Sequence, residues 1–182
     1  MTLTAQRFGS AAALVMVLGL LSQASPGPFT VPLSGTMYSP DEVWQPDCTV
    51  TVQPGQSIQQ AIDAAPEGTV ICLAAGAWEE EIQITKGLTL RGAGWEKTKL
   101  VLKGTSVIIF DVPQSAVSLE RLTVAGGSFT NIWIFRAKVN IFDSQISGSD
   151  GVGIFILGAD VTIVSSQLLD NKGFSIYMQE SG

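Results

Sequence analysis

The sequence contains no histidine, and it is poor in charge of either sign. Only 14% of its 182 residues are charged, 10 of them basic, and the formal net charge is −6. Two cysteines without any histidine argue against a zinc or copper site within the chain. Nucleic-acid binding needs a basic patch or stripe, so the acidic balance argues against that class as well. What the chain does have is a hydrophobic content of 46%, which suits one domain with a sizeable core.

The start of the chain, 1–24, predicts a signal peptide. Arg7 is its only charge, the stretch 11–21 is apolar, and Ser22 and Ala24 are the small residues expected just before a cleavage site. The alternative is an uncleaved membrane anchor, but the apolar run is well short of the ~20 residues that span a bilayer. We therefore expect an extracytoplasmic protein, secreted, periplasmic or at the cell surface, with no membrane span after cleavage.

The two cysteines, Cys48 and Cys72, lie in the strand-like stretches CTVTV and TVICL, on either side of one expected helix. An exported protein matures in an oxidising compartment, where a disulfide persists. We favour a Cys48–Cys72 bridge over the alternative of two buried thiols.

A proline-rich segment, residues 25–46, precedes the folded domain, which we expect over residues 47–182. The segment has no sustained period, as in a linker or a strap lying on the domain. The domain begins with a helix predicted over 57–65, because Ser57 is a good N-cap and Gln60 completes a capping box. Its apolar residues fall on one stripe and are Ile58, Ala61, Ile62 and Ala65.

Downstream of the helix the chain repeats itself. Windows that start at Val117, Val139 and Val161 are equally spaced, with a 22-residue period, and align without a gap. Each opens with Val-x-Leu/Ile, and Gly or Asp recurs at one corner, at Gly126, Gly148 and Asp170. Three short strands in a unit of this length indicate a β-solenoid, in which coils stacked ~4.8 Å apart bury a continuous apolar column. The amphipathic helix would then cap the open N-terminal end of that column.

The stretch TVQPGQSIQQAIDAAPEGTVICLAAGAWEEEIQITKGLTLRGAG resembles the N-terminal cap and first coils of the pectin-lyase-like superfamily. The shared elements are the S-I-Q-x-A-I-D-A-A helix, the G-x-W-x-E-x-I-x-I run and L-T-L-R-G-x-G. The resemblance implies an all-β fold, a right-handed single-stranded parallel β-helix with an N-terminal helical cap. It also implies an extracytoplasmic, carbohydrate-oriented protein, and its members include pectin methylesterases, pectate lyases, polygalacturonases and NosD-type periplasmic proteins.

The superfamily's active-site motifs are missing from this sequence. It lacks the Q-D-T-L-like and D-F-I-F-G-like stretches of the methylesterases, the His-Gly and R-I-K of the polygalacturonases, and an acidic cluster of the calcium-binding type. No cofactor is evident, calcium is an open but unsupported alternative, and whether the chain is an enzyme is left open. The first hypothesis is a carbohydrate-binding or polysaccharide-processing protein. The alternatives are a non-catalytic structural or surface-interaction β-helix and a NosD-type accessory protein.

Two weak catalytic candidates follow from the repeat and from strand alternation. Arg121 and Asp143 share the fifth position of adjacent coils, so stacking places them near each other, where they could bind an acidic sugar or form a surface ion pair. Glu80 lies on the face of Trp78 and Ile82, where an inward acid could do acid–base chemistry. The competing interpretation is that Glu80 accepts hydrogen bonds from the backbone at the end of the cap.

The best binding candidate is an aromatic ladder. Trp133, Phe155 and Tyr177 share one repeat position, and the aliphatic residues on both sides are expected to point into the core. Because side chains alternate along a strand, the three rings should point outward. Such a ladder could bind the apolar face of a polysaccharide, or it could stack on itself and stabilise the sheet.

Gly182 closes the third window at its last position. We therefore expect either that further coils follow in a longer protein or that the open end pairs with another chain, because a bare last coil exposes unpaired strand edges.

Overall fold

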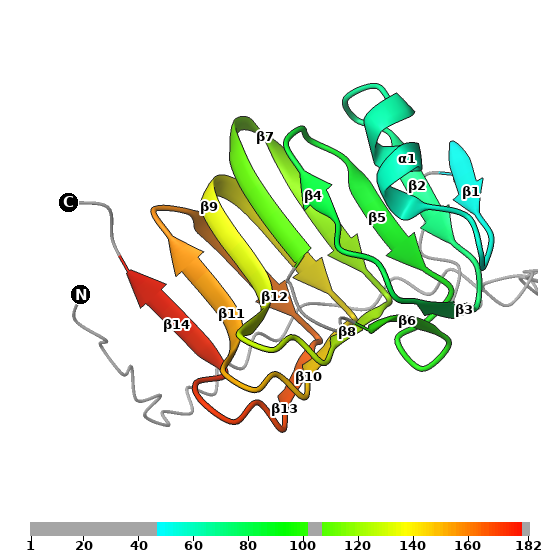
Figure 1. Cartoon of the computed structure of the whole chain (residues 1–182). Coiled ribbons are helices and arrows are strands. Elements are labelled where there is room, and N and C mark those ends of the chain that lie inside the picture. Colours follow the sequence, from blue (N-terminus) through cyan, green and yellow to red (C-terminus); the bar gives the residue numbers. More distant parts are fainter. Residues whose placement is uncertain (1–46, 102–106, 180–182) are drawn as a thin grey trace, which may run out of the picture. The chain divides into compact units, whose positions relative to one another are not determined.

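A computed structural model of the chain describes residues 47–101 and 107–179 (Figure 1). The predicted signal peptide and proline-rich segment, residues 1–46, lie outside the described residues. The described part is a parallel β-solenoid of about six coils, which confirms the predicted fold class. None of its helices is long and apolar enough to cross a membrane.

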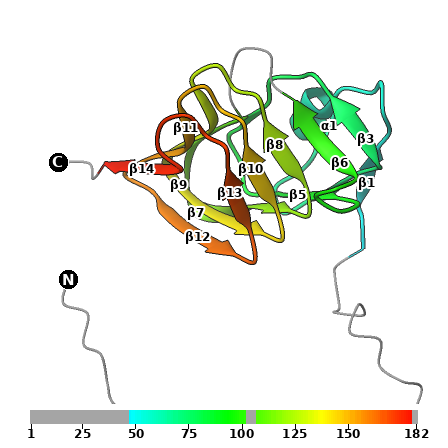
Figure 2. The same cartoon turned by 90° about the horizontal axis from the view of Figure 1, so that it is seen from below.

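Three stacks of parallel strands run along the solenoid and form three faces (Figures 1 and 2). Two long strands, β7 (Val107–Glu120) and β9 (Thr130–Phe142), bend round a corner and contribute to two faces each. What we call the cysteine face contains β1 (Val50–Val52), β2 (Val70–Leu73), β5 (Thr89–Gly92), the second halves of β7 and β9, and β12 (Asp160–Val164). The aromatic face contains β4 (Gln83–Ile84), the first halves of β7 and β9, β11 (Val152–Leu157) and β14 (Ile176–Gln179). The short-strand face contains β3 (Gly76–Trp78), β6 (Thr98–Val101), β8 (Thr123–Ala125), β10 (Gln145–Ser147) and β13 (Gln167–Leu169).

From Val117 onward, the observed strand register matches the predicted 22-residue period. Ile132 pairs with Ile154, and Ile154 pairs with Ile176, each one repeat further along the chain. The coil before is longer, because Val107 pairs with Ile132 until the register shifts between Val112 and Ala116. An insertion after Val112 therefore hides the period upstream of Val117, where the sequence looks less regular.

Each face sends one or two columns of apolar side chains into a shared core. Because stacked coils place equivalent residues above one another, each inward position packs on its counterpart in the next coil. One column on the aromatic face and one on the short-strand face illustrate this: Ile84, Ile109, Ile134, Ile156 and Met178; and Trp78, Leu100, Val124, Ile146 and Leu168. In the last coil the column loses its neighbour on one side, and Met178 is 65% exposed.

The helix α1 (Ile58–Ala64) covers the end of the solenoid beside β1 and β2 (Figure 1). Ser57 is its N-cap and accepts a hydrogen bond from the backbone N–H of Gln60, as the capping-box pattern predicts. Ile58 and Ile62 are buried against the first coils. The predicted helical cap over 57–65 is therefore confirmed, with its two outer residues serving as the caps.

The coils turn at corners, and the equivalent corner residues of successive coils adopt the left-handed backbone conformation. One corner column is Arg121, Asp143 and Ser165, and its φ values are 54°, 45° and 51°. A second corner is Asp111, Arg136 and Gly158, and a third is Gly126, Gly148 and Asp170. The Gly/Asp corner read from the repeat is thus a column of left-handed residues, and the corners set where each face ends.

Candidate functional site: the aromatic face

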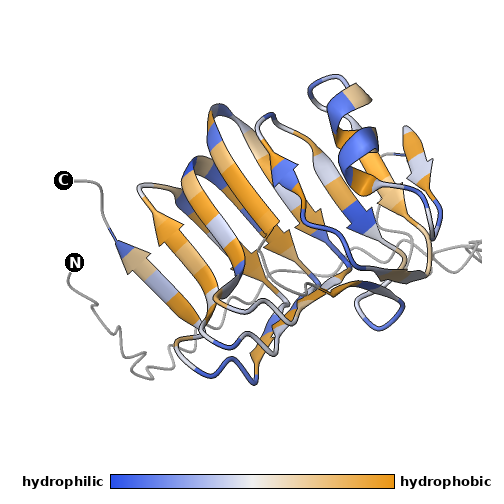
Figure 3. Cartoon of the chain, viewed as in Figure 1, coloured by the Kyte–Doolittle hydropathy of each residue, from blue (hydrophilic) through white to orange (hydrophobic). Residues whose placement is uncertain are grey.

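From β7 onward the outer surface of the aromatic face is mainly apolar. Strand alternation turns two columns of side chains outward from β7, β9, β11 and β14, and Figure 3 shows the first three of these strands mainly in the colours of apolar residues. The first of these columns, which lies closer to the N-terminal ends of the strands, contains Ile108, Trp133, Phe155 and Tyr177. The second column is Phe110, Phe135, Leu157 and Gln179. A large contiguous apolar patch on a protein surface is typical of an interaction site.

The three predicted ladder residues do lie on adjacent coils with their rings in contact. The ring centroids of Trp133 and Phe155 are 5.8 Å apart at an interplanar angle of 70°, and those of Phe155 and Tyr177 are 5.2 Å apart at 22°. Phe155 is therefore covered by a ring on either side and is half-buried. Trp133 and Tyr177 remain 42% and 40% exposed, so these two rings present the accessible aromatic surface.

Two further aromatic side chains flank the start of the face. Phe129 is 65% exposed, and Phe174 is 63% exposed with its ring 6.0 Å from that of Tyr177. Neither belongs to the ladder position, and the repeat alignment did not single them out. The only sequence signal for Phe174 is its place just before Tyr177 in the last window.

Charged residues at both borders of the face are held in pairs. At the corner that ends the strands, Arg136 donates to Asp111, and its guanidinium carbon lies 4.9 Å from the centroid of the Phe135 ring. At the opposite border the ammonium of Lys172 lies 2.7 Å from a carboxylate oxygen of Asp150. The hydrogen bond and charge of Asp150 raise the pKa of Lys172 above its ordinary value.

A surface hollow of about 690 Å³ lies where the aromatic face meets the next corner. Its lining includes Arg136, Lys138, Asp160, Met178 and Gln179. It combines the charged corner with the end of β14, and so lies at one edge of the aromatic face.

The predicted pair Arg121 and Asp143 does stack on adjacent coils, with a nitrogen-to-oxygen distance of 3.9 Å. The two side chains are 42% and 56% exposed, and among the described residues no third ionisable group joins them in a metal-holding cluster. An exposed pair of this length contributes about 0–1 kcal/mol. It lies on the corner after the cysteine face, at a different corner from the one that ends the aromatic strands, so the structure does not bring it into the aromatic site.

The carboxylate of Glu80 caps the N-terminus of helix α1. One carboxylate oxygen accepts from the backbone N–H of Ile58 at 2.7 Å, and the other accepts from the hydroxyl of Ser57 and the N–H of Gln59. A carboxylate at a helix N-terminus satisfies N–H groups that have no partner within the helix. This is the hydrogen-bonding arrangement that competed with a catalytic role, and both carboxylate oxygens of Glu80 take part in it.

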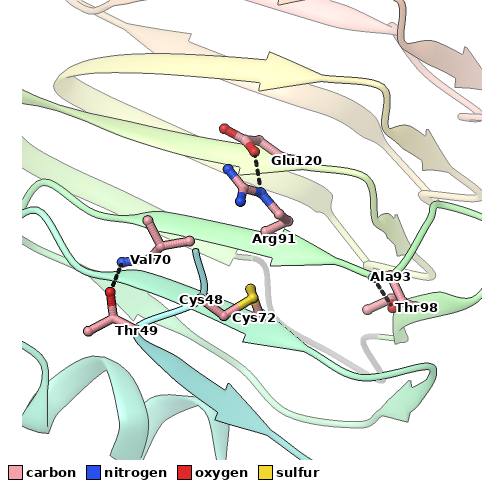
Figure 4. Close-up of a disulfide and its surroundings, with 8 residues drawn as sticks. All are labelled: Cys48, Thr49, Val70, Cys72, Arg91, Ala93, Thr98 and Glu120. Carbon is pink, nitrogen blue, oxygen red and sulfur yellow. Dashed lines mark hydrogen bonds and ion pairs between the residues drawn. A yellow bond between two sulfur atoms is a disulfide. The ribbon is translucent and has the colours of Figure 1, made fainter. Parts of the chain in front are cut away.

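The disulfide expected between Cys48 and Cys72 is present and fastens the start of the domain to β2 (Figure 4). Beside it lies a charge pair that the sequence did not reveal: Arg91 donates to Glu120 at 2.7 Å, from the next two strands of the cysteine face. The two residues are 29 positions apart, outside the regular repeat, so no period connects them in the sequence. Their side chains are largely buried.

No group of three or more His, Cys, Asp or Glu residues in 47–101 and 107–179 is arranged to hold a metal ion. The sequence-based expectation of no cofactor stays a prediction. The comparisons add no relative: no protein-family model, no curated protein and no solved structure matches the chain.

Proposed function

We propose that this is an exported, non-catalytic binding protein whose aromatic face binds a glycan. The observation that supports it is the exposure of Trp133 and Tyr177, at 42% and 40%, on an otherwise apolar outer sheet surface. Pyranose rings have apolar C–H faces that pack on exposed aromatic side chains, and amphipathic rings such as Trp and Tyr also offer a polar group to hydroxyls. Export is supported by the signal-like start of the sequence and by the disulfide.

Binding without catalysis is favoured by what the acidic candidates do. Glu80 is occupied by the helix N-terminus, and Asp143 sits beside Arg121 on an exposed corner. Glycoside hydrolysis needs two carboxylates flanking one bond. No carboxylate of the described residues stands among the outward side chains of the aromatic columns.

The test is a glycan array probed with the parent and with Trp133→Ala plus Tyr177→Ala. Both side chains point outward, so the double variant is expected to keep its far-UV circular dichroism and to lose about tenfold in affinity, since an aromatic contact contributes about 0.5–1.5 kcal/mol per ring. The matched control is Phe142→Ala, a partly exposed aromatic residue on the cysteine face. A double variant that binds as the parent does, or a parent that binds nothing, would overturn the proposal.

A second candidate function is favoured by the stacking of Phe155 on Tyr177 at 5.2 Å. Rings that cover one another stabilise neighbouring strands, which is what a rigid structural or surface-interaction solenoid needs. In that case the edge of β14, with Ile176 at 41% and Met178 at 65% exposed, is a strand edge on which another chain would pair. Nothing in the described residues favours the NosD-type alternative.

A further inference from the structure

We infer that the ligand of the aromatic face is an uncharged polysaccharide that lies along the solenoid axis. The inference rests on the proposed glycan-binding function and narrows it to a substrate class and a direction. It follows from how charges are distributed around the apolar columns.

Each described border of the outward columns carries an ion pair. Arg136 is paired with Asp111 on one side, and Lys172 is paired with Asp150 on the other. Past the first border, Lys138 and Asp160 are register partners on adjacent strands. Neither Arg136 nor Lys172 is therefore left without a counter-charge that a carboxylate or sulfate of a ligand could supply.

A charged polysaccharide would have to displace one of these carboxylates or bind without a counter-charge. The chain's net charge of −6 would also repel a polyanion at long range. A neutral glycan meets neither obstacle, because its ring faces need only apolar contact and its hydroxyls can turn to solvent. The pairing of charges is thus a selective feature as well as a stabilising one.

The direction follows from the shape of the apolar surface. Across the strands, the face ends within a few residues at the corner of Asp111 and Arg136. Along the axis, the outer column from Ile108 to Tyr177 continues from coil to coil without a charged residue. Trp133 and Tyr177 are two coils apart, or ~10 Å at the usual strand spacing, so an extended chain along the axis can contact both rings.

The experiment compares uncharged and charged hexasaccharides of one backbone length. The uncharged probes are β-1,4-linked glucose, mannose and xylose hexamers, and the charged probes are galacturonate and mannuronate hexamers. Calorimetry at about 50 mM and 500 mM NaCl is expected to show binding of at least one uncharged probe, about tenfold or more tighter than any charged one, with less than a twofold salt effect. The affinity for the uncharged probe is expected to fall at least fivefold when the hexamer is shortened to a disaccharide, which cannot span both rings.

Outcomes separate this inference from the proposed function. If a charged probe binds as tightly as the uncharged ones, the face binds glycans but the inference is overturned. If affinity does not depend on length, the axial direction is overturned. If no probe binds, the glycan-binding proposal falls with the inference.

Removing the paired carboxylates tests the charge argument directly. Asp111→Asn plus Asp150→Asn leaves Arg136 and Lys172 unpaired, and asparagine tolerates the left-handed backbone of residue 111. We expect this variant to gain at least fivefold in affinity for the charged hexamers and to change less than twofold for the uncharged probe. Glu67→Gln plus Glu96→Gln changes the net charge equally at two exposed positions off the face, and an equal gain in that control would contradict the inference.

Discussion

The side-chain amides of Asn131 and Asn171, 40 residues apart in sequence, meet in the solenoid, with Nδ2 of Asn131 donating to Oδ1 of Asn171 at 3.1 Å. Asn131 is fully buried, accepts from the N–H of Gly127 at 2.9 Å and donates to the carbonyl of Ser147 at 2.8 Å. One side chain thus satisfies backbone groups of two neighbouring coils. The amide holds together the turn that precedes the aromatic face.

Replacing Asn131 by Ala is therefore expected to destabilise the fold. The change leaves the N–H of Gly127 without this partner, which costs on the order of 1–3 kcal/mol, whereas the carbonyl of Ser147 keeps the N–H of Gly126. Thermal and urea denaturation followed by circular dichroism measure the loss. Asn140→Ala is the control, because Asn140 lies at an outward position of the cysteine face, and we expect it to change stability by less than about 0.5 kcal/mol. Equal effects of the two variants would refute the role assigned to the buried amide.

Removing the carboxylate of Glu80 is expected to loosen the helical cap. Glu80→Ala takes away the acceptor for the N–H groups of Ile58 and Gln59, and charged acceptors of this kind contribute about 1.5–3 kcal/mol. Compared with the parent protein, Glu80→Ala should exchange the amide hydrogens of α1 faster and leave the exchange rates of β9 and β11 unchanged. Glu96→Ala, at an exposed site, is the matched control. Uniform exchange along the chain in Glu80→Ala would mean that the cap does not depend on this residue.

The disulfide is expected to stabilise the N-terminal coils. Cys48 and Cys72 close a loop with a sequence separation of 24, and the chain-entropy relation gives about 3–4 kcal/mol for such a loop. Cys48→Ser plus Cys72→Ser should lower the free energy of unfolding by this amount, which a lower denaturation midpoint would show. The parent in reducing buffer should fall to the midpoint of the double variant. A parent whose midpoint is unaffected by reductant would show that the bridge adds no stability.

The left-handed corners predict opposite effects for two substitutions of one residue. Ser165 has a φ of 51°, a conformation that costs a residue with a side chain about 1–2 kcal/mol and costs glycine nothing sterically. Ser165→Gly is therefore expected to be neutral or stabilising by up to about 1 kcal/mol. Ser165→Val is expected to destabilise, because a β-branched residue fits this region worst. The side chain is exposed, so the two midpoints report on the backbone alone, and a lower midpoint for glycine than for valine would contradict the assignment.

The period explains how much of the site could be predicted. Ile132, Ile154 and Ile176 recur at the same position of successive repeats, so strand alternation alone was enough to predict that Trp133, Phe155 and Tyr177 point outward. The same reasoning applied two positions further on would have found Phe135 and Leu157, the second outer column. It could not extend to Phe110, because the insertion after Val112 breaks the period.

Ring packing and charge pairing could not be read from the period. Which of the ladder rings is covered depends on side-chain rotation, and Phe155 is enclosed because its neighbours turn toward it. Asp111 and Arg136 meet across the irregular coil, 25 residues apart, so the alignment that paired Arg121 with Asp143 missed them.

The sequence by itself determined the solenoid, its capping helix and the outward aromatic position, because these follow from repeat length, strand alternation and local capping, which act within or between adjacent coils. Only the tertiary structure decided that Glu80 belongs to the cap and that Trp133 and Tyr177 are the accessible rings of the ladder. It also decided that Arg136 and Lys172, at the two described borders of the aromatic face, are each paired with a carboxylate. Those outcomes depend on side chains from irregularly spaced coils meeting in space, where hydrogen bonding and charge pairing select one arrangement.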